Sequence, residues 1–210
     1  MPDSSYPANP LLVSTRNPHK ITEIRDILGP AFAVMDLSAC PGVPEVEETG
    51  LTFEENATLK VLAASSLFDG WVIADDSGLE VDALNGAPGI HSARYAGTPA
   101  NDAANNALLL KNLATTGTAN RTARFRCVIV LAKSGKKIAA FSGTVEGTLL
   151  DAPRGLAGFG YDPLFVPQGY GQTFAQLPES IKNALSHRAA ALKHLKNWSG
   201  WNLSPKPQGP

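Results

Sequence analysis

Two adjacent carboxylates and a hydroxyl follow a run of apolar residues in the segment IADDSG, residues 73–78. Like charges this close together resist ionisation unless a cation offsets them. A hard ion such as Mg²⁺ prefers carboxylate oxygens, and it usually takes only one or two of them together with water and substrate phosphates. A turn in which Asp75 and Ser77 hydrogen-bond the backbone is the ordinary alternative. The segment therefore predicts either a turn or a catalytic edge in which Asp76 holds a metal ion.

A second acidic pair, Glu47 and Glu48 in VEETG, is by itself typical of a solvated loop. Its interest lies in a partnership with Asp76, because one glutamate and one aspartate supply enough protein ligands for Mg²⁺. The sequence alone does not choose between the two glutamates.

A third polar cluster, STRNPHK at residues 14–20, places Thr15, Asn17 and Lys20 on a predicted strand-to-helix loop. Free N–H groups and the positive end of the helix dipole attract anions there, and Lys20 adds a full charge. The segment lacks the Walker-type pattern G-x-x-x-x-G-K-[ST], and GLAGFG lacks the glycine order of a dinucleotide-binding turn. The alternatives are an anion-binding loop and a plain capped helix with a solvated lysine.

Two segments in the last third of the chain gather aromatic, charged and polar side chains. FGYDP, residues 159–163, offers an aromatic face on which any base can stack, and Asp162 could accept hydrogen bonds from a base edge or hold another loop. KNALSHR, residues 182–188, gathers two cations and a histidine around Ser186, which would cap the final helix. A turn with a core aromatic residue and a solvated helix start are the ordinary alternatives.

The elements that must position these groups alternate between strand and helix periods. LLVST predicts a short buried strand, and Asn17 and Pro18 predict the cap and first position of a helix with apolar residues at helical spacing. Thr52 and Glu55 have capping-box spacing and predict a second helix through TFEENATLKVLAASSLF. WVIA predicts a buried strand that ends at the acidic pair.

The remaining patterns predict antiparallel sheet in the middle of the chain and helix at its end. A helix is predicted from near Thr98 and Pro99 through NNALLLKNL. FRCVIVLA alternates like a strand, and KSGKK offers a hairpin turn to IAAFS. LFV predicts a short strand, and the last helix is predicted from Ser186 to near Trp198. The fold class is therefore α/β, in one domain with two lobes over residues 11–198.

Composition excludes several functions. The chain has 18 Lys and Arg against 19 Asp and Glu, a formal charge of -1, so no overall cationic field favours nucleic acid or an anionic membrane. The two cysteines fit no metal-ligand spacing, and neither a signal peptide nor an apolar membrane span is evident. We expect a soluble, cytoplasmic protein, with Pro-rich loose tails at residues 1–10 and 199–210.

The set of motifs resembles the inosine triphosphate pyrophosphatase family, the Ham1-like non-canonical purine nucleoside triphosphate diphosphatases. The matching segments, in family order, are STRNPHKITE, EETGLTFEENATLK, IADDSGLEVDALNGAPGIHSARYAG, GFGYDPLF and KNALSHRAAAL. The resemblance implies Mg²⁺-dependent hydrolysis of the small-molecule substrates ITP, dITP and XTP to the monophosphate and pyrophosphate by a homodimer. It also implies an elongated mixed sheet flanked by helices, with the active cleft between two lobes.

The resemblance further implies residue roles at the matching positions. Asp76 is similar to the proton acceptor that also meets the metal, and Glu47 is the expected second metal ligand. The implied substrate contacts are Thr15, Arg16, Asn17, Pro18, His19, Lys20, Lys60, Ser77, Phe159, Gly160, Tyr161, Asp162, Lys182, His187 and Arg188. Arg16 stands where many relatives have glycine, a departure that could alter phosphate affinity.

Two alternatives stay open at the level of sequence. A Maf-like nucleotide pyrophosphatase would share the architecture and act on other nucleotides, whereas a non-catalytic nucleotide-binding module would not need the Asp76 carboxylate. Attack of water on an α-phosphorus needs neutralised phosphates, a metal and a carboxylate that orients or deprotonates the water. The sequence offers a candidate for each part, but it does not rank ITP, dITP and XTP.

Overall fold

The computed structural model describes residues 10–201. The loose tails expected at residues 1–10 and 199–210 lie largely outside this range. Of their described residues, Pro10 begins the first strand, and Trp201 packs edge-on against Trp71 and Trp198. The folded part is therefore slightly longer at each end than residues 11–198.

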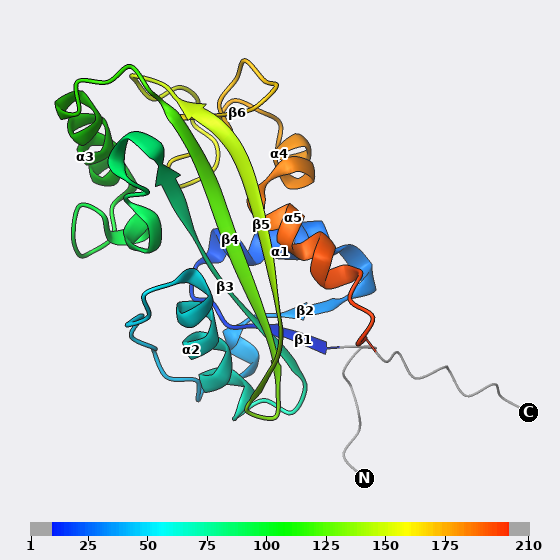
Figure 1. Ribbon diagram of the computed structural model, residues 1–210. Helices are drawn as coiled ribbons and strands as arrows, with labels where there is room; N and C mark the ends of the chain where they lie inside the picture. Colours follow the sequence, from blue (N-terminus) through cyan, green and yellow to red (C-terminus); the bar gives the residue numbers. More distant parts are fainter. Residues whose placement is uncertain (1–9, 202–210) are drawn as a thin grey trace, which may run out of the picture.

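A curled sheet forms the centre of the described chain (Figure 1). It has six strands in the order β2-β1-β3-β4-β5-β6. The pairs of β1 with β2 and with β3 are parallel, and the other pairs are antiparallel, as the sequence predicts for the middle of the chain. The strands are β1 (Pro10–Val13), β2 (Ala33–Met35), β3 (Trp71–Val81), β4 (Thr122–Lys133), β5 (Lys136–Leu149) and β6 (Phe165–Pro167).

Helices cover both faces of this sheet (Figure 1). On one face lie α1 and α5, and on the other lies α2, while α3 packs at the far end of the long strands. The helices are α1 (Pro18–Leu28), α2 (Phe53–Ser65), α3 (Asp102–Thr115), α4 (Glu179–Leu185) and α5 (His187–Lys196), with 3-10 turns η1 (Gly29–Ala31), η2 (Leu37–Ala39), η3 (Asp82–Leu84) and η4 (Gly89–Arg94). The predicted mixed α/β class is confirmed.

The core follows the period of two along the long strands. Ile73 and Cys127 belong to the apolar cluster under α1 and α5, whereas Val72 and Val128 belong to the cluster under α2. A third cluster joins α3 to β6 and the far ends of β3 and β4. The third cluster is the core of the second lobe, and the first two clusters form the core of the first lobe. Because the same sheet passes through both lobes, it fixes them to each other.

Two predicted boundaries are wrong. The strand through WVIA does not end at the acidic pair, because β3 stays paired with β4 from Trp71 to Val81. The helix expected near Thr98 and Pro99 begins at Asp102, since the Asn101 side chain accepts a hydrogen bond from the N–H of Ala104 and caps it. The sequence analysis also missed β2 and α4, which are too short to show a clear period.

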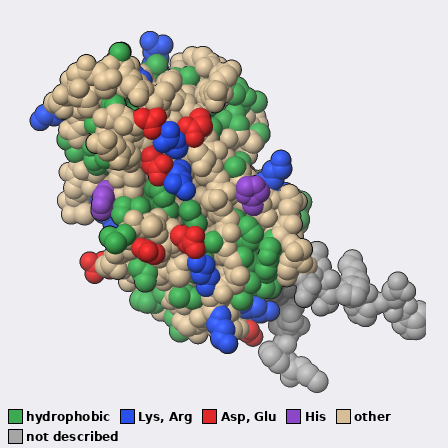
Figure 2. All heavy atoms as spheres, viewed as in Figure 1, with side chains coloured by type: hydrophobic (Ala, Val, Ile, Leu, Met, Phe, Trp, Pro, Cys, Tyr) green, Lys and Arg blue, Asp and Glu red, His purple; other side chains and the backbone are tan. Residues whose placement is uncertain are grey.

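Charges of both signs are intermixed on the face seen in Figure 2. Basic and acidic side chains alternate along its middle. Among the ion pairs of the sheet, Arg124 of β4 meets Asp82 and Glu146. Within residues 10–201, no helix combines the length and apolar composition that a membrane crossing requires.

Candidate active site

The candidate site lies where β1 stops and β3 continues. Val13, the last residue of β1, pairs with Ile73, and the acidic pair follows in β3 after Ala74. The parallel neighbours of β1 lie on its two sides, and ligands of open α/β sheets bind beyond the strand ends at such switch points. A cavity of about 500 Å³ opens there between the two lobes. That volume is within the usual range for small-molecule sites.

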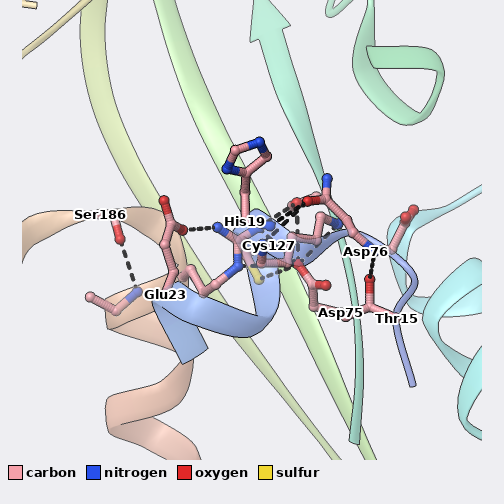
Figure 3. A network of polar contacts seen from close by, with 12 residues as sticks. Thr15, His19, Glu23, Asp75, Asp76, Cys127 and Ser186 are labelled. Carbon is pink, nitrogen blue, oxygen red and sulfur yellow. Dashed lines mark hydrogen bonds and ion pairs between the residues drawn. The ribbon is translucent and has the colours of Figure 1, made fainter. Parts of the chain in front are cut away.

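The two adjacent aspartates face opposite sides of the sheet, because successive side chains of a strand alternate. Asp76 faces α2, where its Oδ1 lies 2.9 Å from Nζ of Lys60. Asp75 faces α1 and α5, where its Oδ2 lies 3.1 Å from Nζ of Lys20 and 2.9 Å from Nη2 of Arg188. Figure 3 shows the polar network around Asp75 and Asp76. IADDSG is thus not a turn but part of a strand with two separate carboxylate sites.

Lys60 joins two carboxylates on the α2 side. Besides Asp76, its Nζ meets Oε1 of Glu48 at 2.8 Å, and Oε2 of Glu48 lies 2.5 Å from Nη2 of Arg94. Glu47 is exposed and lies outside the residues that line the cavity. Glu48, and not the expected Glu47, is therefore the glutamate beside Asp76.

Burial and neighbouring charges shift the pKa values of Asp76 and Lys60. Burial raises the pKa of Asp76 above its ordinary value, although Lys60 and Lys20 act in the opposite direction. Burial also disfavours the charged form of Lys60, but Asp76, Asp75 and Glu48 outweigh it and raise the pKa of the lysine. Lys60 therefore stays a cation, while Asp76 becomes a stronger base than an exposed aspartate.

A buried network of charges lies on the side of β3 that faces α1 and α5 (Figure 3). Glu23 of α1 pairs with Nη1 of Arg188, and its Oε1 lies 2.6 Å from Nζ of Lys182. Lys182 also meets Oδ2 of Asp162 at 2.6 Å. Although burial opposes the charge on Asp75, Lys20 and Arg188 hold the pKa of that carboxyl well below its usual range. Ion pairs thus hold the side chains of this network in place.

The loop after β1, which the sequence predicts as an anion-binding loop, forms one end of the cavity. Asn17 caps α1 by accepting hydrogen bonds from the N–H groups of His19 at 2.9 Å and Lys20 at 3.3 Å, as predicted. Ser14 donates to the carbonyl of Lys60 at 3.1 Å, and Arg16 donates to the carbonyl of Val43 at 3.0 Å. The loop is therefore tied to the wall that carries Lys60 and Glu48.

The opposite end of the cavity is aromatic and cationic. Nζ of Lys182 lies 4.7 Å from the ring centroid of Phe159, and His19 stacks on the same ring at 5.3 Å. His187 is buried and stacks on Phe125 at 4.9 Å. Burial lowers its pKa, so the imidazole is neutral, and its Nδ1 has no hydrogen-bond partner within residues 10–201. This end can stack a base and form hydrogen bonds to its edge.

Most of the predicted site residues meet in this one cavity, although they come from distant segments. Pro18 and His19 do not line it: Pro18 is the first residue of α1, and His19 packs on Phe159. The predicted residues that line the cavity are Thr15, Arg16, Asn17, Lys20, Lys60, Asp76, Ser77, Phe159, Gly160, Tyr161, Asp162, Lys182, His187 and Arg188.

Sequence reasoning missed Glu23, Arg94 and the structural role of Asp75. A signal for Glu23 was present, because it lies three residues after Lys20 and therefore on the same face of α1. Arg94 carried no such signal, since its contact with Glu48 depends on the position of η4 beside the other lobe.

Known proteins match this chain over most of its length. The sequence profile of the Ham1 family matches residues 11–198. A dITP/XTP pyrophosphatase of Geobacter sulfurreducens is 52% identical over 192 residues, which are 91% of this chain and 96% of that protein. A dITP/XTP pyrophosphatase of an Exiguobacterium species is 50% identical over 89% of this chain and 94% of its own length.

Solved structures agree with these matches. The Ham1 protein of Staphylococcus aureus has a TM-score of 0.79 and 43% identity, covering 90% of this chain and 96% of its own. A nucleoside-triphosphatase, or dITP/XTP pyrophosphatase, of Mycobacterium abscessus has a TM-score of 0.71 and 40% identity, covering 90% of this chain and 100% of its own. The likeness therefore extends over both lobes and the cavity between them.

Proposed function

Because the chain belongs to the Ham1 family, we propose that it hydrolyses the non-canonical purine nucleotides ITP, dITP and XTP to the monophosphate and pyrophosphate. The observation that carries this proposal is one cavity with Asp76 and Lys60 beside an anion-binding loop at one end and Phe159 with Lys182 at the other. Such a cavity matches a nucleoside triphosphate in both size and order of groups. The relatives named dITP/XTP pyrophosphatase favour this function over a Maf-like specificity or a non-catalytic module.

Asp76 is the proposed acceptor of the proton from the attacking water. Its carboxylate faces the cavity, and in the protein without metal burial raises its pKa above the ordinary value. A carboxylate in this place can orient or deprotonate the attacking water. Lys60 and Asn56 hold its two oxygens, with Nδ2 of Asn56 at 3.4 Å from Oδ2. The base therefore has a fixed orientation before the substrate arrives.

The loop after β1 is the proposed site of the departing pyrophosphate. Lys20 and Lys60 bring two positive charges to this end, and Arg16 adds a third at its rim. The charge that develops on the leaving group needs such neutralisation in a site with limited water. Binding of the outer phosphates here would place the α-phosphorus nearest to Asp76.

Mg²⁺ is the proposed cofactor, and the donor set fits it. Carboxylate oxygens of Asp76 and Glu48 converge on one ammonium group, that of Lys60. Mg²⁺ commonly takes one or two carboxylates and completes its shell with water and substrate phosphates. The ion would supply Lewis-acid stabilisation of the phosphate charge.

The test is a pyrophosphate assay with ITP, XTP, dITP, ATP and GTP, with Mg²⁺ and with EDTA. We expect pyrophosphate in equal amount to the monophosphate, and none when EDTA removes the metal. Hydrolysis of ITP in ¹⁸O-labelled water should put the label in inosine monophosphate, because attack at the α-phosphorus releases pyrophosphate intact. Labelled pyrophosphate at early times would mean attack at the β-phosphorus, and inosine diphosphate with orthophosphate would mean terminal cleavage. Either result would contradict this mechanism.

We also propose a homodimer. A groove of about 1210 Å³ lies between α2, η4 and the strands β4 and β5, and Leu51 on its rim is 84% exposed. Apolar side chains gather on the face seen in Figure 2. Exposed apolar groups of this kind mark protein interfaces. Leu51→Glu should therefore lower the mass measured by light scattering from that of a dimer toward that of a monomer, and a monomeric wild type would contradict the proposal.

The proposed place of action is the cytoplasm. Both Cys40 and Cys127 are free thiols, as expected in a reducing compartment. The proposed substrates are nucleotides, which agrees with this location.

A further inference from the structure

Side chains of α3 hold both the N–H and the C=O of one glycine in the cavity wall. The N–H of Gly160 donates to Oδ2 of Asp102 at 2.6 Å, and its carbonyl accepts from Nδ2 of Asn106 at 2.8 Å. Asp102 and Asn106 are four residues apart and therefore share one face of the helix. Nδ2 of Asn106 also donates to the carbonyl of Asp102 at 2.9 Å, so the two holding groups are themselves joined.

This glycine lies between the residues that form the nucleoside end of the cavity. Gly160 has φ of 62°, in the left-handed region, so the loop turns sharply between Phe159 and Tyr161. Two more bonds fix the turn: the N–H of Phe159 donates to Asp162 at 2.9 Å, and the hydroxyl of Tyr161 donates to the carbonyl of Ser92 at 2.8 Å. The position of the Phe159 ring therefore depends on how Gly160 is held.

The same helix holds a second wall of the cavity. Asn105 is buried, donates to the carbonyl of Ala93 at 3.0 Å and accepts from the N–H of Ala96 at 2.7 Å. Ala93 lines the cavity together with Arg94, the partner of Glu48. One face of α3 thus fixes two wall segments that are distant in sequence, one at residues 93–96 and one at Gly160.

We propose that Asp102 and Asn106 are positioning residues for base selection: they hold Gly160 so that Phe159 and Asp162 meet the base in one orientation. The inference rests on the proposed function, because it assumes that the substrate is a purine nucleotide. Asp102 also lines the cavity, but its bond to Gly160, like that of Asn106, acts through the loop. Their loss should therefore affect recognition of the base and leave recognition of the phosphates intact.

The test compares Asp102→Ala with two matched variants. Asp102→Asn keeps an oxygen that accepts from Gly160 and removes only the charge. Asn101→Ala removes the cap of α3, in which Oδ1 of Asn101 accepts from the N–H of Ala104 at 3.0 Å. This change leaves the bonds to Gly160 in place. Loss of a cap destabilises a helix, so Asn101→Ala reports what weakening of the helix start does by itself.

We expect Asp102→Ala to lower kcat/KM for ITP by about tenfold, on the scale of a misplaced binding group, and to lower the ratio of ITP to ATP activity with it. Inhibition by pyrophosphate should stay within about twofold, because the loop after β1 is unchanged. Asp102→Asn should recover most of the loss, and Asn101→Ala should keep the ratio of the wild type. Amide exchange of residues 157–162 should rise in Asp102→Ala alone.

Three outcomes would overturn the inference: an unchanged ITP-to-ATP ratio in Asp102→Ala, an equal fall of the ratio in Asn101→Ala, or an equal loss of pyrophosphate binding. Calorimetric binding of inosine monophosphate separates this inference from the proposed function. If the wild type binds that nucleotide without hydrolysing ITP, the function fails, and weaker binding by Asp102→Ala still supports the positioning role. If the wild type does not bind it, both fail.

Discussion

We expect Asp76→Asn to lower kcat for ITP at least about 100-fold, the scale of a lost general base. Asparagine keeps the shape of the side chain, but it has neither the charge nor the basicity that the proposed proton transfer needs. Nucleotide binding should survive, because the anion-binding loop and the Phe159 end of the cavity are unchanged. Turnover at different Mg²⁺ concentrations and binding of ITP by calorimetry measure the two effects separately.

Asp69→Asn is a suitable control, because Asp69 is exposed and does not line the cavity. It should turn over ITP like the wild type. If Asp76→Asn also retained normal turnover, Asp76 would not be the base. Glu48→Gln would then be the next variant, since Glu48 is the other carboxylate that shares Lys60.

The alternation of the long strands explains why the sequence indicated Asp76 but not the role of Asp75. The two are chemically identical neighbours, and only the match of motifs named Asp76. Only the pairing of β3 with β4 through the pair shows that they face different helices. Of the two, Asp75 meets the buried Arg188, and Asp76 meets the cavity and Lys60.

Local signals were sufficient where capping or periodicity decides the structure. Asn17 and Ser186 cap α1 and α5 as predicted, because a cap depends on residues within one turn. Glu48 and Arg94 are different, since their pairing depends on how a loop and η4 approach each other across the cavity. Contacts that are distant in sequence follow from the sheet order, which the local patterns do not specify.

We expect kcat/KM for ITP to exceed that for ATP by at least about 100-fold, because unpaired buried polar groups are costly. Hypoxanthine carries an oxo acceptor at position 6, where adenine carries an amino donor. The nucleoside end of the cavity is rich in donors: Lys182 uses two of its three N–H groups on Glu23 and Asp162, and Arg188 is a buried cation beside it. An amino group placed against these donors would leave both sides unpaired.

His187→Ala is the clearest variant for this prediction and should narrow the gap between ITP and ATP. Arg188→Ala should narrow it too, but it leaves the buried carboxylates of Asp75 and Glu23 without a partner, which typically costs 3–5 kcal/mol of stability. Its activity must therefore be compared at a temperature where the variant is folded. GTP shares the 6-oxo group, so its rejection would have to come from its 2-amino group. Equal kcat/KM for ITP and ATP in the wild type would contradict the donor-rich recognition of the base and favour a pyrophosphatase of broader specificity.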